Sequence, residues 1–177
     1  MDPHEQSPLE LNPLLVLTED SDAQEEVFFH EVPVGQKLRL FGSAHTPKIS
    51  GASDQEREHF AATLAPEDLL TERPTNYRRW WNNSWSVVEE GGQTHAGDWS
   101  AAEMQRLRAL VDHAHRLGYW IRFYVLDGFT PAEDLGWNKI YNLGSRDAVM
   151  IRWKAAIAAG ADLIATDQYE DLAALLK

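Results

Sequence analysis

An apolar stretch at residues 118–128 limits the folds that this chain can adopt. Its sequence, Gly-Tyr-Trp-Ile-Arg-Phe-Tyr-Val-Leu-Asp-Gly, is apolar at nearly every position, whereas a strand with one face in water alternates between apolar and polar residues. Because side chains alternate along a strand, two rows are expected: Tyr119, Ile121, Phe123 and Val125 in one, and Trp120, Arg122, Tyr124 and Leu126 in the other. The stretch therefore predicts an inner strand of a parallel sheet, as in a β/α barrel.

Arg122 is the one cation in this predicted strand. A guanidinium on the row that faces a barrel interior is costly to desolvate, so it must meet a carboxylate or a bound anion. The first interpretation is a structural ion pair, because barrel interiors contain fixed charge pairs. The second is a clamp for the oxyanion of a ligand, and both stay open at this point.

Strand and helix patterns alternate along the chain. Strands are expected at 14–18, 37–43, 76–85, 118–128 and 163–167. Helices are expected after Ser21, over 53–64, over 100–117, between Gly144 and Gly160, and after Asp167. The clearest helix is 100–117, because Ser100 and Glu103 form a capping box and Gly118 supplies the C-terminal stop. Strands that are separated by helices in this way predict a parallel sheet with right-handed crossovers.

This alternation predicts an α/β fold, a partial TIM-type β/α barrel of about five parallel units. A complete (β/α)₈ barrel has about 250 residues, and this chain has 177. We therefore expect the N-terminal units to be missing, with residues 1–11 as a disordered segment or linker and 12–177 as the C-terminal part of the barrel domain. An open half-barrel exposes two strand edges and an apolar inner face. A missing N-terminal half, a second copy or another chain is expected to cover them.

Charge and cysteine content exclude several classes of protein. The net charge is -12, so nucleic acid is a disfavoured partner. The chain has no cysteine, which excludes a disulfide framework, a thiolate metal site and a cysteine nucleophile. No apolar run approaches the ~18 residues that span a bilayer, and the start lacks the pattern of a secretion signal. We expect a soluble protein, and its location stays unknown.

Candidate functional residues follow from the rule that β/α barrels place their active sites at the C-terminal ends of the strands. For substrate binding the rule selects Tyr124, Trp81, Asn83, Trp85 and Asp127, and Arg122 joins them as the cation expected to face the barrel interior. For catalysis the candidates are His45 and Arg122. Each has a structural alternative, since the tryptophans could fill the core and His45 could be an exposed loop residue. Glu19, Asp20 and Asp167 precede predicted helices, so we expect them to cap those helices.

Two further groups of polar residues are predicted to face solvent. His113 and His115 lie two positions apart on a predicted helix, so their side chains point about 200° apart and cannot chelate one ion. Glu89 and Glu90 precede two glycines, and we expect them in a solvated loop.

The segments 120–124, Trp-Ile-Arg-Phe-Tyr, and 160–167, Gly-Ala-Asp-Leu-Ile-Ala-Thr-Asp, resemble the last two barrel strands of the phospholipase-C-like phosphodiesterase superfamily. This superfamily includes glycerophosphodiester phosphodiesterases and phosphatidylinositol-specific phospholipases C. The resemblance implies a barrel that cleaves a phosphodiester with a histidine acid/base pair and a divalent metal, Ca²⁺ or Mg²⁺, held by carboxylates on the first strands. Those strands are not found here, and the His-x-Gly at 95–97 falls in a loop after the third predicted strand. The chain alone therefore supports no metal.

Three functions remain open. The first is a phosphoric diester hydrolase domain for a glycerophosphodiester or phosphoinositide-like substrate. Its ligand would be a small phosphodiester or a lipid head group, and we expect little activity from this chain alone. Arg122 would hold the phosphate, because a guanidinium can bind two oxygens at once. The second is a carbohydrate-active barrel, in which tryptophans stack on sugars and two carboxylates act as acid and base. The third is a truncated, non-catalytic barrel that serves as an interaction module.

Overall fold

The computed structural model describes residues 14–45, 47–51, 53–90, 97–135 and 142–177. Five parallel strands form one sheet in the order β1-β2-β3-β4-β5. The strands are β1 Val16–Thr18, β2 Leu40–Ser43, β3 Arg78–Ser84, β4 Trp120–Tyr124 and β5 Leu163–Ile164. The helices are α1 Asp22–Glu31, α2 Asp54–Thr63, α3 Pro66–Leu69, α4 Ala101–Leu117, α5 Arg146–Ala159 and α6 Tyr169–Leu175, with a 3₁₀ turn η1 at Trp85–Val87.

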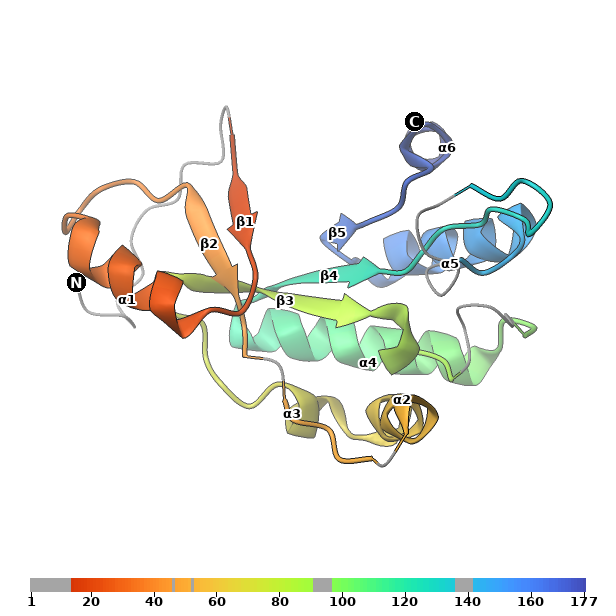
Figure 1. Ribbon diagram of the computed structural model, residues 1–177, viewed down its shortest axis with the longest axis horizontal. Helices are drawn as coiled ribbons and strands as arrows, with labels where there is room; N and C mark the ends of the chain where they lie inside the picture. The colour runs from red at the N-terminus through yellow and green to blue at the C-terminus, as the bar shows by residue number, and fades with distance from the viewer. Residues whose placement is uncertain (1–13, 46, 52, 91–96, 136–141) are drawn as a thin grey trace.

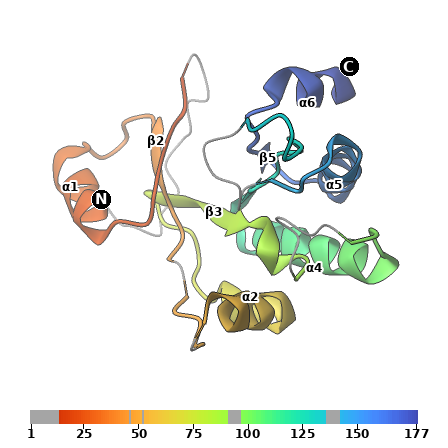
Figure 2. The ribbon, with the colours of Figure 1, turned by 45° about the vertical axis from the view of Figure 1, so that its right-hand side comes forward.

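The sheet curls into a half-barrel (Figure 1). Figure 1 shows the edge strands β1 and β5 on one side of β3 and β4, with α4 on the other side, and Figure 2 shows β3 between β2 and β5 with α4 beneath it. We call the side that carries α4 the outer face and the other side the inner face. The predicted α/β class and the parallel order of five β/α units are confirmed. The short helix α3 was not predicted, because four residues around Pro66 show no periodic pattern.

The expected two rows of β4 are present as far as Tyr124. Ile121 and Phe123 are fully buried on the outer face, whereas Arg122 and its row are only partly buried on the inner face. Beyond Tyr124 the expectation is wrong, because Val125 lines an inner cavity and Leu126 lies in the outer core. The cause is the backbone of Val125, whose φ of 68° breaks the extended conformation and with it the alternation of sides.

Helix α4 delivers the chain into β4 as predicted. The Ser100 side chain accepts from the Glu103 N–H, and the Glu103 carboxylate accepts from the Ser100 N–H. Gly118 ends the helix with a φ of 96°, and its N–H donates to the carbonyls of Ala114 and His115. The described helices, α4 included, lack the combination of length and apolar character that crossing a membrane requires.

A buried ion pair joins the end of the 3₁₀ turn to α5. Glu89 is 4% exposed and Arg152 is 1% exposed, and Arg152 Nε and Nη2 donate to the two Glu89 oxygens over 3.0 and 2.9 Å. The Trp85 indole N–H adds a third bond to the same carboxylate. Burial raises the pKa of Glu89, and the hydrogen bonds from Arg152 oppose that rise. The expectation of a solvated Glu89 is therefore wrong, because a partner 63 residues away satisfies the charge.

Arg152→Met should destabilise the protein by about 3–5 kcal/mol, because it leaves the Glu89 carboxylate buried without a counter-charge. Chemical denaturation monitored by circular dichroism measures the loss. The double variant Glu89→Leu/Arg152→Met removes both charges and should recover a large part of it. A single variant as stable as the wild type would show that the pair is not buried as described.

His113 is also buried, contrary to the expectation. Its Nε2 lies 2.7 Å from the Leu70 carbonyl, and only 7% of the residue is exposed. His115, on another side of α4, pairs with Asp162 across 2.9 Å. The two histidines therefore have separate partners, as the helical geometry predicted, but the first contacts the segment after α3 instead of solvent.

Candidate functional site

A cavity of about 620 Å³ lies on the inner face, where the strands end. We call it the inner cavity. It is lined by Glu19, Asn82, Arg122, Tyr124, Val125, Asp127, Ile164, Ala165, Thr166 and Asp167. These residues come from β3, β4 and β5 and from the segments that follow β1, β4 and β5. This is the edge of the sheet at which parallel β/α folds bind their ligands.

Arg122 is held in the inner cavity by an amide and two aromatic rings. Its Nη1 donates to Asn82 Oδ1 over 2.7 Å, and its guanidinium carbon lies 5.8 Å from the Trp80 ring centre and 5.5 Å from that of Tyr124. Within the described residues, no carboxylate lies within 4.0 Å of this guanidinium. Burial lowers the pKa of Arg122, but an arginine side chain stays protonated in proteins. Arg122 is therefore held in place by two rings and an amide, and it could still bind an anion.

Asn82 links this cation to an acid. Its side-chain N–H donates to Glu19 Oε2 over 3.2 Å, while its oxygen accepts from Arg122. Asn82 and Arg122 are register partners in the pairing of β3 with β4, so their side chains project from the same face. The Asn82 amide therefore lies between Glu19 and Arg122. Its nitrogen contacts the carboxylate and its oxygen contacts the guanidinium.

Asp127 provides a buried carboxylate at the other side of the cavity. The residue is 6% exposed, and its Oδ1 accepts from the Thr166 hydroxyl and from the Asp167 N–H, both over 2.7 Å. Burial raises the pKa of Asp127, and these hydrogen bonds oppose the rise. The carboxylate is thus fixed by the segment after β5, with its Oδ2 left without a partner among the described residues.

Backbone strain accompanies this placement. A β-branched residue at positive φ is rare and costs about 1–3 kcal/mol, and Val125 adopts it between Arg122 and Asp127. Neighbouring bonds hold the turn in place: the Trp153 indole donates to the Leu126 carbonyl over 3.0 Å, and the Leu143 N–H donates to the Asp127 carbonyl over 2.7 Å. Strain of this kind tends to occur at functional sites.

Three predicted substrate-binding residues, Arg122, Tyr124 and Asp127, come together in the inner cavity. The other three do not line it. Trp81 and Trp85 are packed in the outer core, and Asn83 is 5% exposed on the same face as Trp81. The alternation of β3 explains the difference, because Asn82 takes the inner position and its two neighbours point outward. Register with Arg122 is the signal that could have selected Asn82.

His45 lies outside the inner cavity, beside a separate cavity of about 190 Å³. Its Nδ1 is 2.5 Å from Glu72 Oε2, and its Nε2 is 2.9 Å from Asp22 Oδ1. The bond to Glu72 raises the pKa of His45, partial burial opposes this, and the bond to Asp22 raises it further. The structure therefore places the two catalytic candidates, His45 and Arg122, in different surroundings, with His45 in an ion-pair network.

Arg78 forms the centre of this network. It is 1% exposed, and its three nitrogens donate to Asp20, Asp22 and Glu25 over 2.6–2.7 Å. These bonds attach the start of α1 to β3. Asp20 thus serves as a partner of Arg78 and not as a helix cap, and α1 is capped by Ser21.

The other two expected caps also have different roles. Glu19 binds Asn82 in the inner cavity. Asp167 precedes Gln168, the N-cap residue of α6, and no side-chain hydrogen bond caps this helix.

Asp20, Asp22 and His45 place their ligand atoms within 4.8 Å of one another, the one such trio in the described chain. These residues do not fit Ca²⁺ or Mg²⁺. Both aspartates already accept from the Arg78 guanidinium, whose charge would repel a cation, and imidazole is a poor ligand for either metal. We derive no metal chemistry from them.

His45→Gln should lower the free energy of unfolding by less than about 1 kcal/mol, since the ion pairs of His45 with Asp22 and Glu72 are largely exposed. The pKa of His45 is raised in the folded protein, so its contribution is complete below the usual histidine pKa of about 6.5. This contribution to stability is lost as the pH rises through the pKa that His45 has in the folded protein. Urea denaturation between pH 6 and pH 9 should show the gap between wild type and variant closing at high pH. His30→Gln, at an exposed position of α1, is the control, and a gap that widens with pH would contradict the network.

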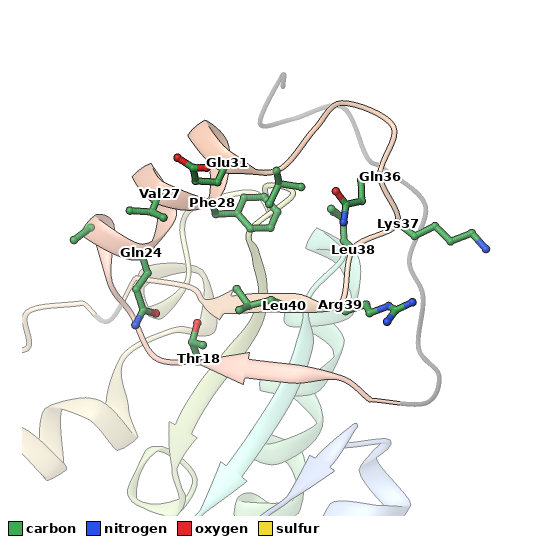
Figure 3. A pocket seen from close by; sticks show the side chains of 12 residues that line it. Thr18, Gln24, Val27, Phe28, Glu31, Gln36, Lys37, Leu38, Arg39 and Leu40 are labelled. Carbon is green, nitrogen blue, oxygen red and sulfur yellow. The ribbon is translucent and has the colours of Figure 1, made fainter.

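A larger cavity, of about 950 Å³, lies between α1 and β2 (Figure 3). Its lining mixes apolar with polar and charged side chains and includes Val27, 61% exposed, and Leu40, 37% exposed. This groove lies away from the inner cavity, and no helix or strand of the described chain fills it.

His95, the histidine of the His-x-Gly at 95–97, lies outside the described residues.

Comparisons with protein-family models, with curated proteins and with solved structures gave no match to this chain. The resemblance to phospholipase-C-like phosphodiesterases therefore rests on the two segments quoted above.

Proposed function

We propose that this chain is a phosphodiester-binding half-barrel of the phospholipase-C-like type, with Arg122 as the contact for the phosphate. The supporting observation is the state of this guanidinium: it is half-buried at the strand ends, oriented by Asn82 and two rings, and has no carboxylate within ion-pair distance among the described residues. A phosphodiester oxygen would supply the missing anionic partner.

Arg122 is oriented before any ligand binds. Asn82 fixes one of its nitrogens, so the remaining N–H groups keep a defined direction. Prior orientation of this kind reduces the entropy lost when a ligand binds.

The carbohydrate alternative loses its main support. Trp81 and Trp85 are buried in the outer core, at 3% and 0% exposure, so they cannot stack on a sugar in the inner cavity. The completion of the half-barrel, by additional β/α units or by a second copy, stays a proposal together with the TIM-type assignment.

Arg122→Gln should weaken the binding of bis(p-nitrophenyl) phosphate at least tenfold, because it removes a charge-assisted hydrogen bond of about 1.5–3 kcal/mol. Isothermal titration calorimetry measures the affinity. Arg108→Gln, which removes an exposed arginine on α4, should leave it unchanged, and Arg122→Lys should recover only part of it, because lysine lacks the planar fork.

The same ester reports turnover. We expect little or no release of nitrophenol with Ca²⁺ or Mg²⁺ present, because no histidine lines the inner cavity among the described residues. Equal affinity in wild type and Arg122→Gln, with circular dichroism showing both folded, would refute the proposed function.

A further inference from the structure

Exposed apolar side chains lie at both edges of the sheet. At the β1 edge, Val16 and Leu40 are register partners, so they project from the same face, and both are exposed. At the β5 edge, Tyr169 at the start of α6 and Leu176 directly after this helix are also exposed. In a closed β/α barrel each edge meets a further strand and its helix. The half-barrel thus has apolar surface at the two places where such neighbours belong.

The hollow at the β1 edge is the cavity of about 950 Å³ between α1 and β2, and we call it the α1 groove (Figure 3). Phe28 is buried at its base. Val27 and Glu31 are exposed on its α1 side, and Lys37 and Arg39 are exposed on its β2 side. The groove thus combines an apolar base with two cations along one rim, in a chain whose net charge is -12.

The α1 groove opens on the outer face of the sheet. Phe41 packs against Trp120 with ring centres 5.5 Å apart, and Trp120 belongs to the inner row that contains Arg122. Because side chains alternate along β2, Leu40 points to the outer face, where it lines the groove. Helix α6 lies on the same face, since Leu172 is packed in the outer core. The groove and α6 are therefore in one layer of helices, at its opposite ends (Figure 1).

Helix α6 carries an apolar stripe that faces away from this core. Tyr169, Ala173 and Leu176 lie at positions i, i+4 and i+7 and are all exposed, which is the spacing with which an amphipathic helix fills an apolar groove. Glu170 is exposed beside the stripe. The stripe and its acid thus match the apolar base and the cationic rim of the α1 groove. Within one chain the two surfaces cannot meet, because they flank opposite edge strands of the sheet.

We propose that α6 of a second copy of this chain docks in the α1 groove, so that two half-barrels associate. Tyr169 and Leu176 of one copy pack against Val27 and the base of the groove in the other, and Glu170 approaches the cationic rim. In a parallel β/α fold, a helix covers the strand before it and the strand that follows. For α6, the following strand is β1 of the second copy.

A two-fold axis along the barrel makes both contacts at once. This rotation keeps all strands parallel and sets β5 of each copy beside β1 of the other, so the association closes at two copies instead of growing into a filament. Figure 1 shows β1 and β5 on one side of β3 and β4, so the open sides of two copies can face each other. The inference is independent of phosphodiester binding, because none of the side chains in this contact lines the inner cavity.

The mass in solution tests the association. At roughly 100 μM protein, sedimentation equilibrium of the full chain should give twice the 20.1 kDa of one chain. Val27→Asp and Leu176→Asp each place a charge in the apolar contact and should raise the dissociation constant of the dimer at least about tenfold. Phe60→Asp, which adds the same charge at an exposed apolar position of α2, should leave the mass doubled. Circular dichroism confirms that each variant is folded.

Cross-linking identifies which surfaces meet. The chain has no cysteine, so Val27→Cys and Leu176→Cys each introduce a single thiol that a short bis-maleimide can join to another. A mixture of the two variants should give a covalent dimer on a denaturing gel. Neither variant alone should do so, because the two-fold axis places identical positions at different contacts. Ile151→Cys, at an exposed position of α5, is the matched control and should give no dimer in a mixture with either variant.

Three results would overturn the inference. The first is the mass of a single chain at this concentration. The second is a doubled mass that persists in both aspartate variants, since the copies would then meet elsewhere. The third is a mixture that does not cross-link, or cross-linking of Val27→Cys alone, which would show two α1 grooves facing each other. None of these results bears on the affinity of Arg122 for a phosphodiester, so this inference and the proposed function fail separately.

Discussion

A buried guanidinium must have partners for its charge, and this half-barrel holds several such groups. Arg78 meets three carboxylates from the start of α1 and the segment before it, and Arg152 meets Glu89 with both oxygens. These pairs connect segments that are far apart in the sequence: α1 and the segment before it with β3, and the segment after η1 with α5. Loss of one partner would leave an uncompensated charge inside the protein, so the pairs fix the positions of α1 and α5 on the sheet.

Arg122 and Arg79 differ from these two. Arg79 is 6% exposed and donates to Asn76 over 2.9 Å, and its Nε has no partner in the described chain. It lines none of the cavities described above. Arg122 also donates to an amide, but it faces a cavity at the strand ends and is oriented by two rings. Accessibility, more than the missing counter-charge, is what makes Arg122 the candidate for ligand binding.

Local patterns predicted the framework well, because they depend on near neighbours in the sequence. The capping box at Ser100, the stop at Gly118 and the alternation up to Tyr124 all place Arg122 on the inner face. The positive φ of Val125 was not predictable, since no glycine or asparagine marks it, and it moves Leu126 to the opposite side. The partners of Glu89 and His113 lie 63 and 43 residues away, beyond the reach of any local pattern. The site is therefore predictable where strand alternation decides it, and not where distant partners do.

The side-chain Nε–H resonances of the arginines test the central claim most directly, namely that Arg122 is the guanidinium available to a phosphate. In a protein labelled with ¹⁵N at arginine, each resonance is assigned by substitution and followed by NMR during titration with a phosphodiester. The Arg122 resonance should shift and saturate, while those of Arg78 and Arg152, whose Nε–H groups already donate to carboxylates, should stay in place. A titration that leaves Arg122 unmoved, or that shifts Arg78 instead, would contradict the account.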